Sequence, residues 1–247
     1  MVDVSQYSYS IRTNGDKRSP HEPNKVNSLP LTFENLAIRI AATGGLFVGL
    51  DRDGTLIEDC GYGVMPEDVV LKPGINDLYA SLCRLGHPWE TAVFTNQSAV
   101  GRGLTSYDTV EKVNQQVARS VNLAVGAEWL VEKRFFVCPH DPSFGCRCRK
   151  PNSLMYELAS KALSTTQWPF VMIGDRSVDV AFAEHCHGVS IQIVAGSETI
   201  EASEQSSIGH ERSSAYMASS LKQAGKIIEE AGVSVPSSRS ELWRRVI

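Results

Sequence analysis

The 247-residue chain lacks the features expected of a secreted, membrane-spanning or nucleic-acid-binding protein. No apolar run approaches the roughly 20 residues that a transmembrane helix needs. Residues 1–20 contain no apolar core of the kind that a secretion signal carries. The formal net charge of −4 gives no basic surface for a nucleic acid. From these absences we expect a cytoplasmic protein that binds neither membranes nor nucleic acids.

Cysteine is also scarce, and its distribution is uneven. Three of the six cysteines lie close to His140, namely Cys138, Cys146 and Cys148. An even count could indicate disulfides in a small secreted chain, but nothing else in the sequence indicates secretion. In a reducing compartment such clustering favours a metal, and these four residues complete the tetrahedral set of a structural Zn²⁺. Because the spacing departs from that of ordinary zinc fingers, an oxidisable thiol cluster without metal remains the alternative.

Most of the chain has the composition and periodicity of a folded α/β protein. Apolar residues make up 42% of it, as in an ordinary globular domain. Short apolar runs typical of buried strands occur at 46–50, 91–94, 134–137, 170–173 and 189–194. Helical periodicity occurs at 33–40, 110–121, 154–162, 181–185 and 217–228, and Thr105 and Asp108 have the spacing of a capping box. Strands that alternate with helices predict a three-layer α/β sandwich with a central, mainly parallel sheet of the Rossmann type.

Changes in composition divide the chain into three parts. Residues 1–44 form an N-terminal extension, partly disordered, which is rich in Ser, Asn, Pro and charge up to about residue 30 and ends in a short helix. Residues 45–196 carry the α/β domain. Residues 197–247 form a C-terminal helical extension that packs on the domain or follows it.

Polar residues suited to chemistry follow four of the five predicted strands. The segments are Asp51-Arg52-Asp53-Gly54-Thr55, Thr95-Asn96-Gln97-Ser98, the Cys/His loop with Arg149-Lys150, and Gly174-Asp175-Arg176. In open parallel sheets, ligands bind beyond the carboxyl ends of the strands. We therefore expect these segments to converge on one site.

The side chains of these segments suit the transfer of a phosphoryl group. A carboxylate that attacks a phosphate monoester is repelled by its negative charge unless cations shield both groups. Asp51 and Asp175 offer hard oxygen ligands for Mg²⁺, while Lys150 and the Thr95 hydroxyl could steady the phosphoryl oxygens. Asp51 and Asp53 leave the same face of an extended chain, so one can attack phosphorus while the other transfers the proton of the leaving alcohol. An isolated Asp-x-Asp at a strand end is usually a turn or cap, so the prediction depends on the whole set.

These motifs resemble those of the haloacid-dehalogenase-like (HAD-like) phosphatases. The matching residues are 51–55, 95–98, Lys150 and 174–176. Within that superfamily, Cys138-Pro139-His140 and the run from Cys146 to Pro151 resemble the D-glycero-D-manno-heptose-1,7-bisphosphate 7-phosphatase and histidinol-phosphatase group. The resemblance covers residues 46–196 and implies a HAD-like fold with a minimal cap and a zinc-binding loop. It also implies a magnesium-dependent phosphatase that forms an aspartyl-phosphate.

The resemblance assigns roles residue by residue. Asp51 would be the nucleophile, Asp53 the general acid/base, and Thr95 and Lys150 would stabilise the phosphoryl group. Mg²⁺ would bind the Asp51 carboxylate, the Asp53 backbone carbonyl and the Asp175 carboxylate. Substrate would contact Asp59, Cys60, Gly61, Tyr62, Asn96, Gln97, Ser98, Arg149 and Arg176. A structural Zn²⁺ would bind Cys138, His140, Cys146 and Cys148, and so direct Arg149 and Lys150 toward the phosphate.

The choice of substrate depends on smaller features. Ser98 to Gly103 resembles the heptose branch better than the histidinol branch. Gly61 to Gly63 lacks a histidine often seen in heptose enzymes, Ala99 replaces a usual glycine, and Arg176 stands where those enzymes often carry lysine. We expect a heptose 1,7-bisphosphate cleaved at the 7-position, with histidinol phosphate as the alternative.

Two other classes of protein remain open at this point. One is a catalytically inactive, zinc-stabilised interaction protein, which the intact Asp51, Asp53, Lys150 and Asp175 disfavour. The other is a nucleic-acid end phosphatase, which the acidic balance disfavours. We expect a monomer whose partner is a small phosphorylated metabolite.

Overall fold

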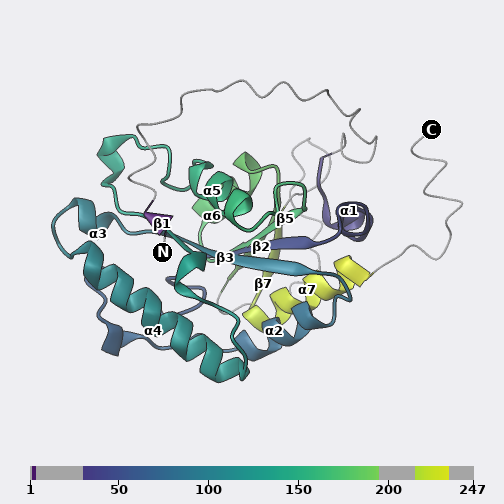
Figure 1. The fold of residues 1–247 in the computed structure, drawn as a ribbon, viewed down its shortest axis with the longest axis horizontal. Helices are drawn as coiled ribbons and strands as arrows, with labels where there is room; N and C mark the ends of the chain where they lie inside the picture. Colours follow the sequence, from purple (N-terminus) through teal and green to yellow (C-terminus); the bar gives the residue numbers. More distant parts are fainter. Residues whose placement is uncertain (1, 4–29, 195–214, 234–247) are drawn as a thin grey trace, which may run out of the picture.

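Seven parallel strands form a single sheet within residues 2–3, 30–194 and 215–233, the parts of the chain that the computed structural model describes (Figure 1). The strand order is β1-β4-β3-β2-β5-β6-β7. The strands are β1 Val2–Asp3, β2 Leu46–Leu50, β3 Trp89–Asn96, β4 Phe135–Cys138, β5 Phe170–Gly174, β6 Val189–Ile193 and β7 Ala215–Ala218. The five strands predicted from apolar runs are confirmed, each within two residues at either end.

Helices cover both faces of the sheet and complete the predicted three-layer sandwich. In Figure 1, α5 and α6 lie on one side of the strands and α2, α4 and α7 lie on the other. The α-helices are α1 Leu36–Thr43, α2 Ile75–Cys83, α3 Ser98–Gly101, α4 Tyr107–Val125, α5 Leu154–Ala162, α6 Ser177–His185 and α7 Leu221–Val233. The 3₁₀ helices are η3 Phe33–Asn35, η4 Pro66–Asp68, η5 Glu132–Arg134 and η6 Pro142–Phe144.

The central strand β2 shows why the sequence forms this architecture. All five of its residues are buried, as expected for a parallel strand covered on both faces. Leu46, Val48 and Leu50 join the core that α1, α2, α4 and α7 cover, whereas Phe47 joins the core under α5 and α6. Alternate side chains of a strand point to opposite faces, so one short run supplies both cores.

The start of α4 differs from the prediction. Ser106 is the N-cap, and its hydroxyl accepts a hydrogen bond of 3.0 Å from the Thr109 amide. The predicted capping box of Thr105 and Asp108 is therefore wrong, because the helix begins one residue later than that box requires. Asp108 instead pairs with Lys112 one turn along the helix, at 2.8 Å.

The segment that follows residue 214 contributes to the sheet as well as to a helix. Met217 lies in β7, which pairs with β6, and the predicted helix begins only at Leu221. Helix α7 packs closely on α2, a helix that the sequence analysis did not predict. A Cβ added at Gly225 would lie 3.0 Å from the Leu78 Cα, so glycine allows this close approach.

The sheet order also fixes where a ligand can bind. From β2 the chain moves through β3 to β4 on one side, and then through β5, β6 and β7 on the other. The adjacent strands β2 and β5 therefore flank the topological switch point, where open parallel sheets bind ligands beyond the strand tips. In the described ranges, no helix has both the length and the apolar character required to cross a membrane. Most of residues 1–30 and the segments 195–214 and 234–247, on which predictions about the two extensions were made, lie outside the described residues.

Candidate active site and metal-binding loop

Three aspartates and a lysine meet beyond the tips of β2 and β5. The Lys150 ammonium donates hydrogen bonds to Asp51 Oδ1 at 2.7 Å, Asp179 Oδ1 at 2.6 Å and the Phe94 carbonyl at 2.8 Å. Carboxylate oxygens of Asp51, Asp175 and Asp179 all lie within 4.8 Å of one another. Asp51, Lys150 and Asp179 are buried. The structure thus brings together Asp51, Lys150 and Asp175 as predicted, and adds Asp179.

Burial and the lysine act in opposite directions on Asp51. Burial raises the pKa of Asp51 to about 7, the Lys150 ammonium opposes that shift, and the charges of Asp179 and Asp53 add to it. Burial also raises the pKa of Asp175, assisted by Asp179. Burial disfavours the charge of Lys150, but Asp51 and Asp179 together raise its pKa above the ordinary value. The three carboxylates carry more negative charge than one ammonium balances, which suits the binding of a divalent cation.

Two glycines allow the backbone to approach these carboxylates. Gly54 has φ +83°, and a Cβ there would lie 2.3 Å from Asp175 Oδ2. A Cβ at Gly174 would lie 2.3 Å from the Asp179 side chain. A side chain at either position would displace a carboxylate, so the glycines of both motifs are required for the geometry of the site.

Asp53 is held from two sides. Its Oδ2 accepts hydrogen bonds from the Thr95 hydroxyl at 3.2 Å and from Gln97 Nε2 at 2.7 Å. On the other side, Arg52 donates to Asp53 Oδ1 from Nε at 3.1 Å and from Nη2 at 3.0 Å. Thr95, predicted to contact phosphate, and Gln97, predicted to contact substrate, therefore both orient Asp53 in this structure.

The backbone around Lys150 is fixed by the tip of β3. Asn96 Oδ1 accepts from the Lys150 amide at 3.0 Å, and Asn96 Nδ2 donates to the Lys150 carbonyl at 3.2 Å. The preceding side chain, Arg149, has a buried Nη1 that lacks a hydrogen-bond partner among the described residues. Such a donor is costly to bury unless something else satisfies it, so Arg149 is suited to hold an anionic or hydroxyl-bearing ligand. Ser98, the last residue of this predicted group, is buried at the start of α3.

The loop after β2 is joined to the tip of β5 by an ion pair. Asp59 pairs with Arg176, which follows β5, and also accepts from the Gly61 amide at 2.9 Å. Tyr62 is 64% exposed, and the Arg102 guanidinium lies 5.4 Å from its ring centroid. Cys60 is different, because its thiol contacts carbonyls of Glu58 and Asp68 within 4 Å, inside its own loop.

Four side chains, one at the end of β4 and three in the loop that follows, form a compact sulfur and nitrogen cluster. Cys138 Sγ lies 3.5 Å from Cys146 Sγ and 3.4 Å from Cys148 Sγ, and His140 Nδ1 lies 3.2 Å from Cys148 Sγ. Ligands about 2.3 Å from a tetrahedral Zn²⁺ are separated by roughly 3.8 Å, so the donor set and spacing fit zinc. The hydrogen bond from Cys148 lowers the pKa of Cys138 to about 5, and the same contact raises the pKa of Cys148.

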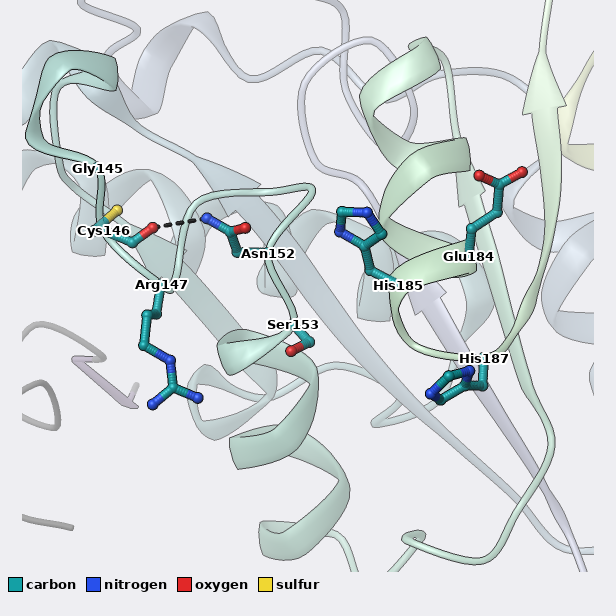
Figure 2. Close-up of a pocket in the computed structure, with 8 residues that line it drawn as sticks. All are labelled: Gly145, Cys146, Arg147, Asn152, Ser153, Glu184, His185 and His187. Atoms are coloured by element: carbon teal, nitrogen blue, oxygen red, sulfur yellow. Dashed lines mark hydrogen bonds between the residues drawn. The ribbon is translucent and has the colours of Figure 1, made fainter.

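A cavity of about 660 Å³ lies beside this loop (Figure 2). Its lining joins the Cys/His loop to the start of α5 and the end of α6, through Cys146, Asn152 and His185 among others. Asn152 Nδ2 donates to the Cys146 carbonyl at 2.8 Å across this cavity. None of the site aspartates lines it, so we do not assign it to the reaction.

Sequence reasoning missed three residues of the site. Asp179 lies outside the Gly174-Asp175-Arg176 motif and is not among the predicted site residues. Its position in the first turn of α6, directly beyond the tip of β5, was a usable signal, because residues just beyond the strand tips of a parallel sheet lie where ligands bind. Arg52 was read only as part of the aspartate motif, and no signal in the sequence links it to Asn114, a partner 62 positions away.

Comparisons with known proteins indicate the family of the chain. A family model described as HAD-hydrolase-like matches residues 147–224. The D-glycero-beta-D-manno-heptose-1,7-bisphosphate 7-phosphatase of Pseudomonas putida is 32% identical, over 62% of this chain and 85% of its own length. The enzyme of the same name from Haemophilus ducreyi is 31% identical, over 56% of this chain and 76% of its own.

A solved structure has the same fold. The D,D-heptose 1,7-bisphosphate phosphatase from B. bronchiseptica, crystallised with magnesium and phosphate, matches with a TM-score of 0.57 at 21% identity. The match covers 73% of this chain and 96% of that one. The chain therefore belongs to the HAD-like phosphatases, in the group that contains the D-glycero-D-manno-heptose-1,7-bisphosphate 7-phosphatases.

Proposed function

We propose that this phosphatase hydrolyses the 7-phosphate of D-glycero-D-manno-heptose 1,7-bisphosphate through a phosphoryl group carried on Asp51, in the presence of Mg²⁺. The observation that carries the proposal is the contact of Lys150 with Asp51 and Asp179, beside Asp175, at the switch point of the sheet. This arrangement offers a nucleophile, a fixed positive charge and spare carboxylates within one small volume.

The reaction proceeds in two steps. A carboxylate oxygen of Asp51 attacks phosphorus, the bond from phosphorus to the sugar oxygen breaks, and Asp53 gives that oxygen its proton. A water then attacks the phosphoryl group, the bond to Asp51 breaks, and Asp53 takes the proton of the water. Lys150 stabilises negative charge in both steps, because it stays protonated between Asp51 and Asp179.

Asp51, Asp175 and the Asp53 carbonyl would hold Mg²⁺. When bound, the cation would reduce the repulsion between carboxylate and phosphate, and it would favour the ionised form of Asp51 against the effect of burial. The Cys/His cluster would hold a structural Zn²⁺, since all four protein ligands leave no position for a reacting water.

The names of relatives at about 30% identity favour heptose bisphosphate as the substrate. We propose that Arg149 and Arg176 contact the sugar or its second phosphate. Arg149 has a buried Nη1 with no hydrogen-bond partner in the described part of the chain, and Arg176 lies at the tip of β5. Histidinol phosphate is the second candidate, because histidinol phosphatases more often carry arginine at the position of Arg176.

The test is phosphate release from a panel that contains the heptose bisphosphate, histidinol phosphate, 4-nitrophenyl phosphate and a 5′-phosphorylated oligonucleotide, each with and without Mg²⁺. We expect the highest kcat/KM for the heptose bisphosphate, with the 1-phosphate left intact. Preference for histidinol phosphate or the oligonucleotide would replace the substrate assignment. No turnover of any member would instead favour the inactive interaction protein.

A first mutational prediction tests the nucleophile. Asp51→Asn keeps the shape of the side chain but cannot form the aspartyl-phosphate, so we expect kcat to fall by at least about 10⁴-fold, as when one member of a catalytic unit is removed. Circular dichroism should show that the fold is retained. Measurable multiple turnover by the pure variant would contradict the mechanism.

A further inference from the structure

Arg52 is a buried arginine that stands between the two aspartates of the motif in sequence. Only 1% of its surface is exposed. Its guanidinium contacts Asp53 through Nε and Nη2, and its Nη1 donates to Asn114 Oδ1 at 2.8 Å. Asn114 is itself fully buried in α4, next to the apolar residues Val113 and Val117.

The burial of Arg52 and Asn114 contributes little to the stability of the fold compared with apolar residues in the same space. Burial of a charged group costs several kcal/mol unless ion pairs and hydrogen bonds offset it, and apolar residues of similar volume often give equal or greater stability. Asn114 likewise places an amide on the apolar face of an amphipathic helix. Both departures are explained if the contacts fix the geometry of Asp53 rather than the stability of the fold.

The geometry acts on Asp53 through a short relay. Asn114 fixes one end of the planar guanidinium, and the other end makes hydrogen bonds to both carboxylate oxygens of Asp53, with Nε 3.1 Å from Oδ1 and 3.2 Å from Oδ2. A general acid must lie within hydrogen-bond reach of the oxygen that it protonates, so a small rotation of this carboxylate would slow proton transfer.

We propose, on the basis of the function proposed above, that Arg52 and Asn114 are positioning residues that aim Asp53 at the leaving-group oxygen. Neither contacts the reacting atoms. In the first step, the phosphorus–oxygen bond breaks and the Asp53 proton passes to the sugar oxygen. In the second, the proton of the attacking water passes to Asp53, so both steps depend on its orientation.

The test compares two leaving groups. A sugar alkoxide needs the proton of Asp53, whereas 4-nitrophenolate leaves without one. For Asn114→Ala we expect kcat/KM to fall on the order of 10²-fold for the sugar phosphate, the usual size of a general acid's contribution, and to stay near wild type for 4-nitrophenyl phosphate. Rapid-quench experiments with the aryl substrate should also show phosphorylated enzyme accumulating, because the second step is slowed.

Val113→Ala is the matched control, since it removes buried volume from the same turn of α4 and should leave the ratio of the two kcat/KM values unchanged.

Arg52→Lys provides a second variant if Asn114→Ala fails to fold. It keeps the charge but loses the planar fork, so we expect the same selective loss. Equal loss for both substrates, or no loss in either variant, would overturn the positioning role and leave a purely structural one. Those outcomes are distinct from failure of the proposed function, which retained turnover by Asp51→Asn would reveal.

Discussion

The aspartate site and the Cys/His loop are both suited to metals, but the chain assembles them in different ways. The aspartate site draws on Asp51, Lys150, Asp175 and Asp179, which come together only when β2 and β5 pair. The four donors of the loop lie within residues 138–148 and need only a local turn. Their donor atoms differ accordingly, with hard carboxylate oxygens in one and thiolates with imidazole in the other.

The two regions adjoin at Lys150. The aspartate site therefore depends on the loop more than the loop depends on the aspartate site. Lys150 follows the last loop donor, Cys148, by two residues, and Asn96 on β3 fixes its backbone. A change in the conformation of the loop should therefore displace Lys150, whereas replacement of the Lys150 side chain should leave the loop able to bind metal. From this comparison we infer that the loop positions the Lys150 ammonium, and the following variants test that unequal dependence.

The largest effect is expected from Lys150→Met, which breaks the aspartate site while sparing the loop. Removal of one partner from a buried ion pair costs about 3–5 kcal/mol, and here it leaves Asp51 and Asp179 without their shared cation. We expect urea denaturation to show that loss, turnover to fall below detection, and zinc content measured by mass spectrometry to remain at about one per chain. Added Mg²⁺ should restore part of the lost stability by binding the carboxylates that have lost their lysine partner.

Lys72→Met is the control for that variant. Lys72 pairs with Glu58 at 3.1 Å in a partly exposed position, where an ion pair contributes at most about 1 kcal/mol. A loss of zinc in Lys150→Met, or equal destabilisation by both variants, would contradict the unequal dependence.

A smaller effect is expected from Cys146→Ser, which breaks the loop. Serine is a poor zinc ligand, so we expect zinc content to fall well below one per chain. Because the backbone that leads to Lys150 is then held less firmly, turnover should fall by about 10- to 100-fold. Cys83→Ser, at an exposed cysteine outside the cluster, should change neither quantity. Full activity in a zinc-free but stable Cys146→Ser protein would show that the two regions are independent.

The smallest effect is expected from Asn152→Ala, which removes the hydrogen bond to the Cys146 carbonyl seen in Figure 2. Supporting contacts of this kind tune metal affinity, so competition with a zinc chelator should show a decrease of about tenfold. Turnover at saturating zinc should match wild type. A large loss of turnover at saturating zinc would mean that Asn152 acts on Lys150 directly.

Much of the fold could be predicted because the buried strands have short, continuous apolar runs. Leu46–Leu50 and Phe170–Gly174 are fully buried, and the polar residues that follow them mark the catalytic edge of the sheet. Helix α2 escaped prediction because its buried positions include Ser81, which interrupts the apolar pattern. Strand β7 escaped prediction because it is only four residues long and most of its side chains are only half-buried.

The site was predicted where function imposes a local motif and missed where it depends on distant contacts. Asp51, Asp175 and the loop donors stand in recognisable short patterns. The partners of Asp53 do not, because Arg52 is held by Asn114, which lies 62 positions away on a helix that carries no other sign of chemistry. Such contacts are set by tertiary packing, and a single sequence holds no periodic signal for them.

The packing of α7 on α2 has a consequence for any attempt to shorten the protein. Leu221, Ala224 and Ile228 are buried in the same core as Leu78 and Leu82, although the aspartates all precede them in the chain. A version trimmed after β6 would keep every proposed catalytic residue. It would, however, expose the apolar side of α2 and leave the edge of β6 unpaired, and both features promote self-association. Solubility, more than chemistry, would set how small this enzyme can be made.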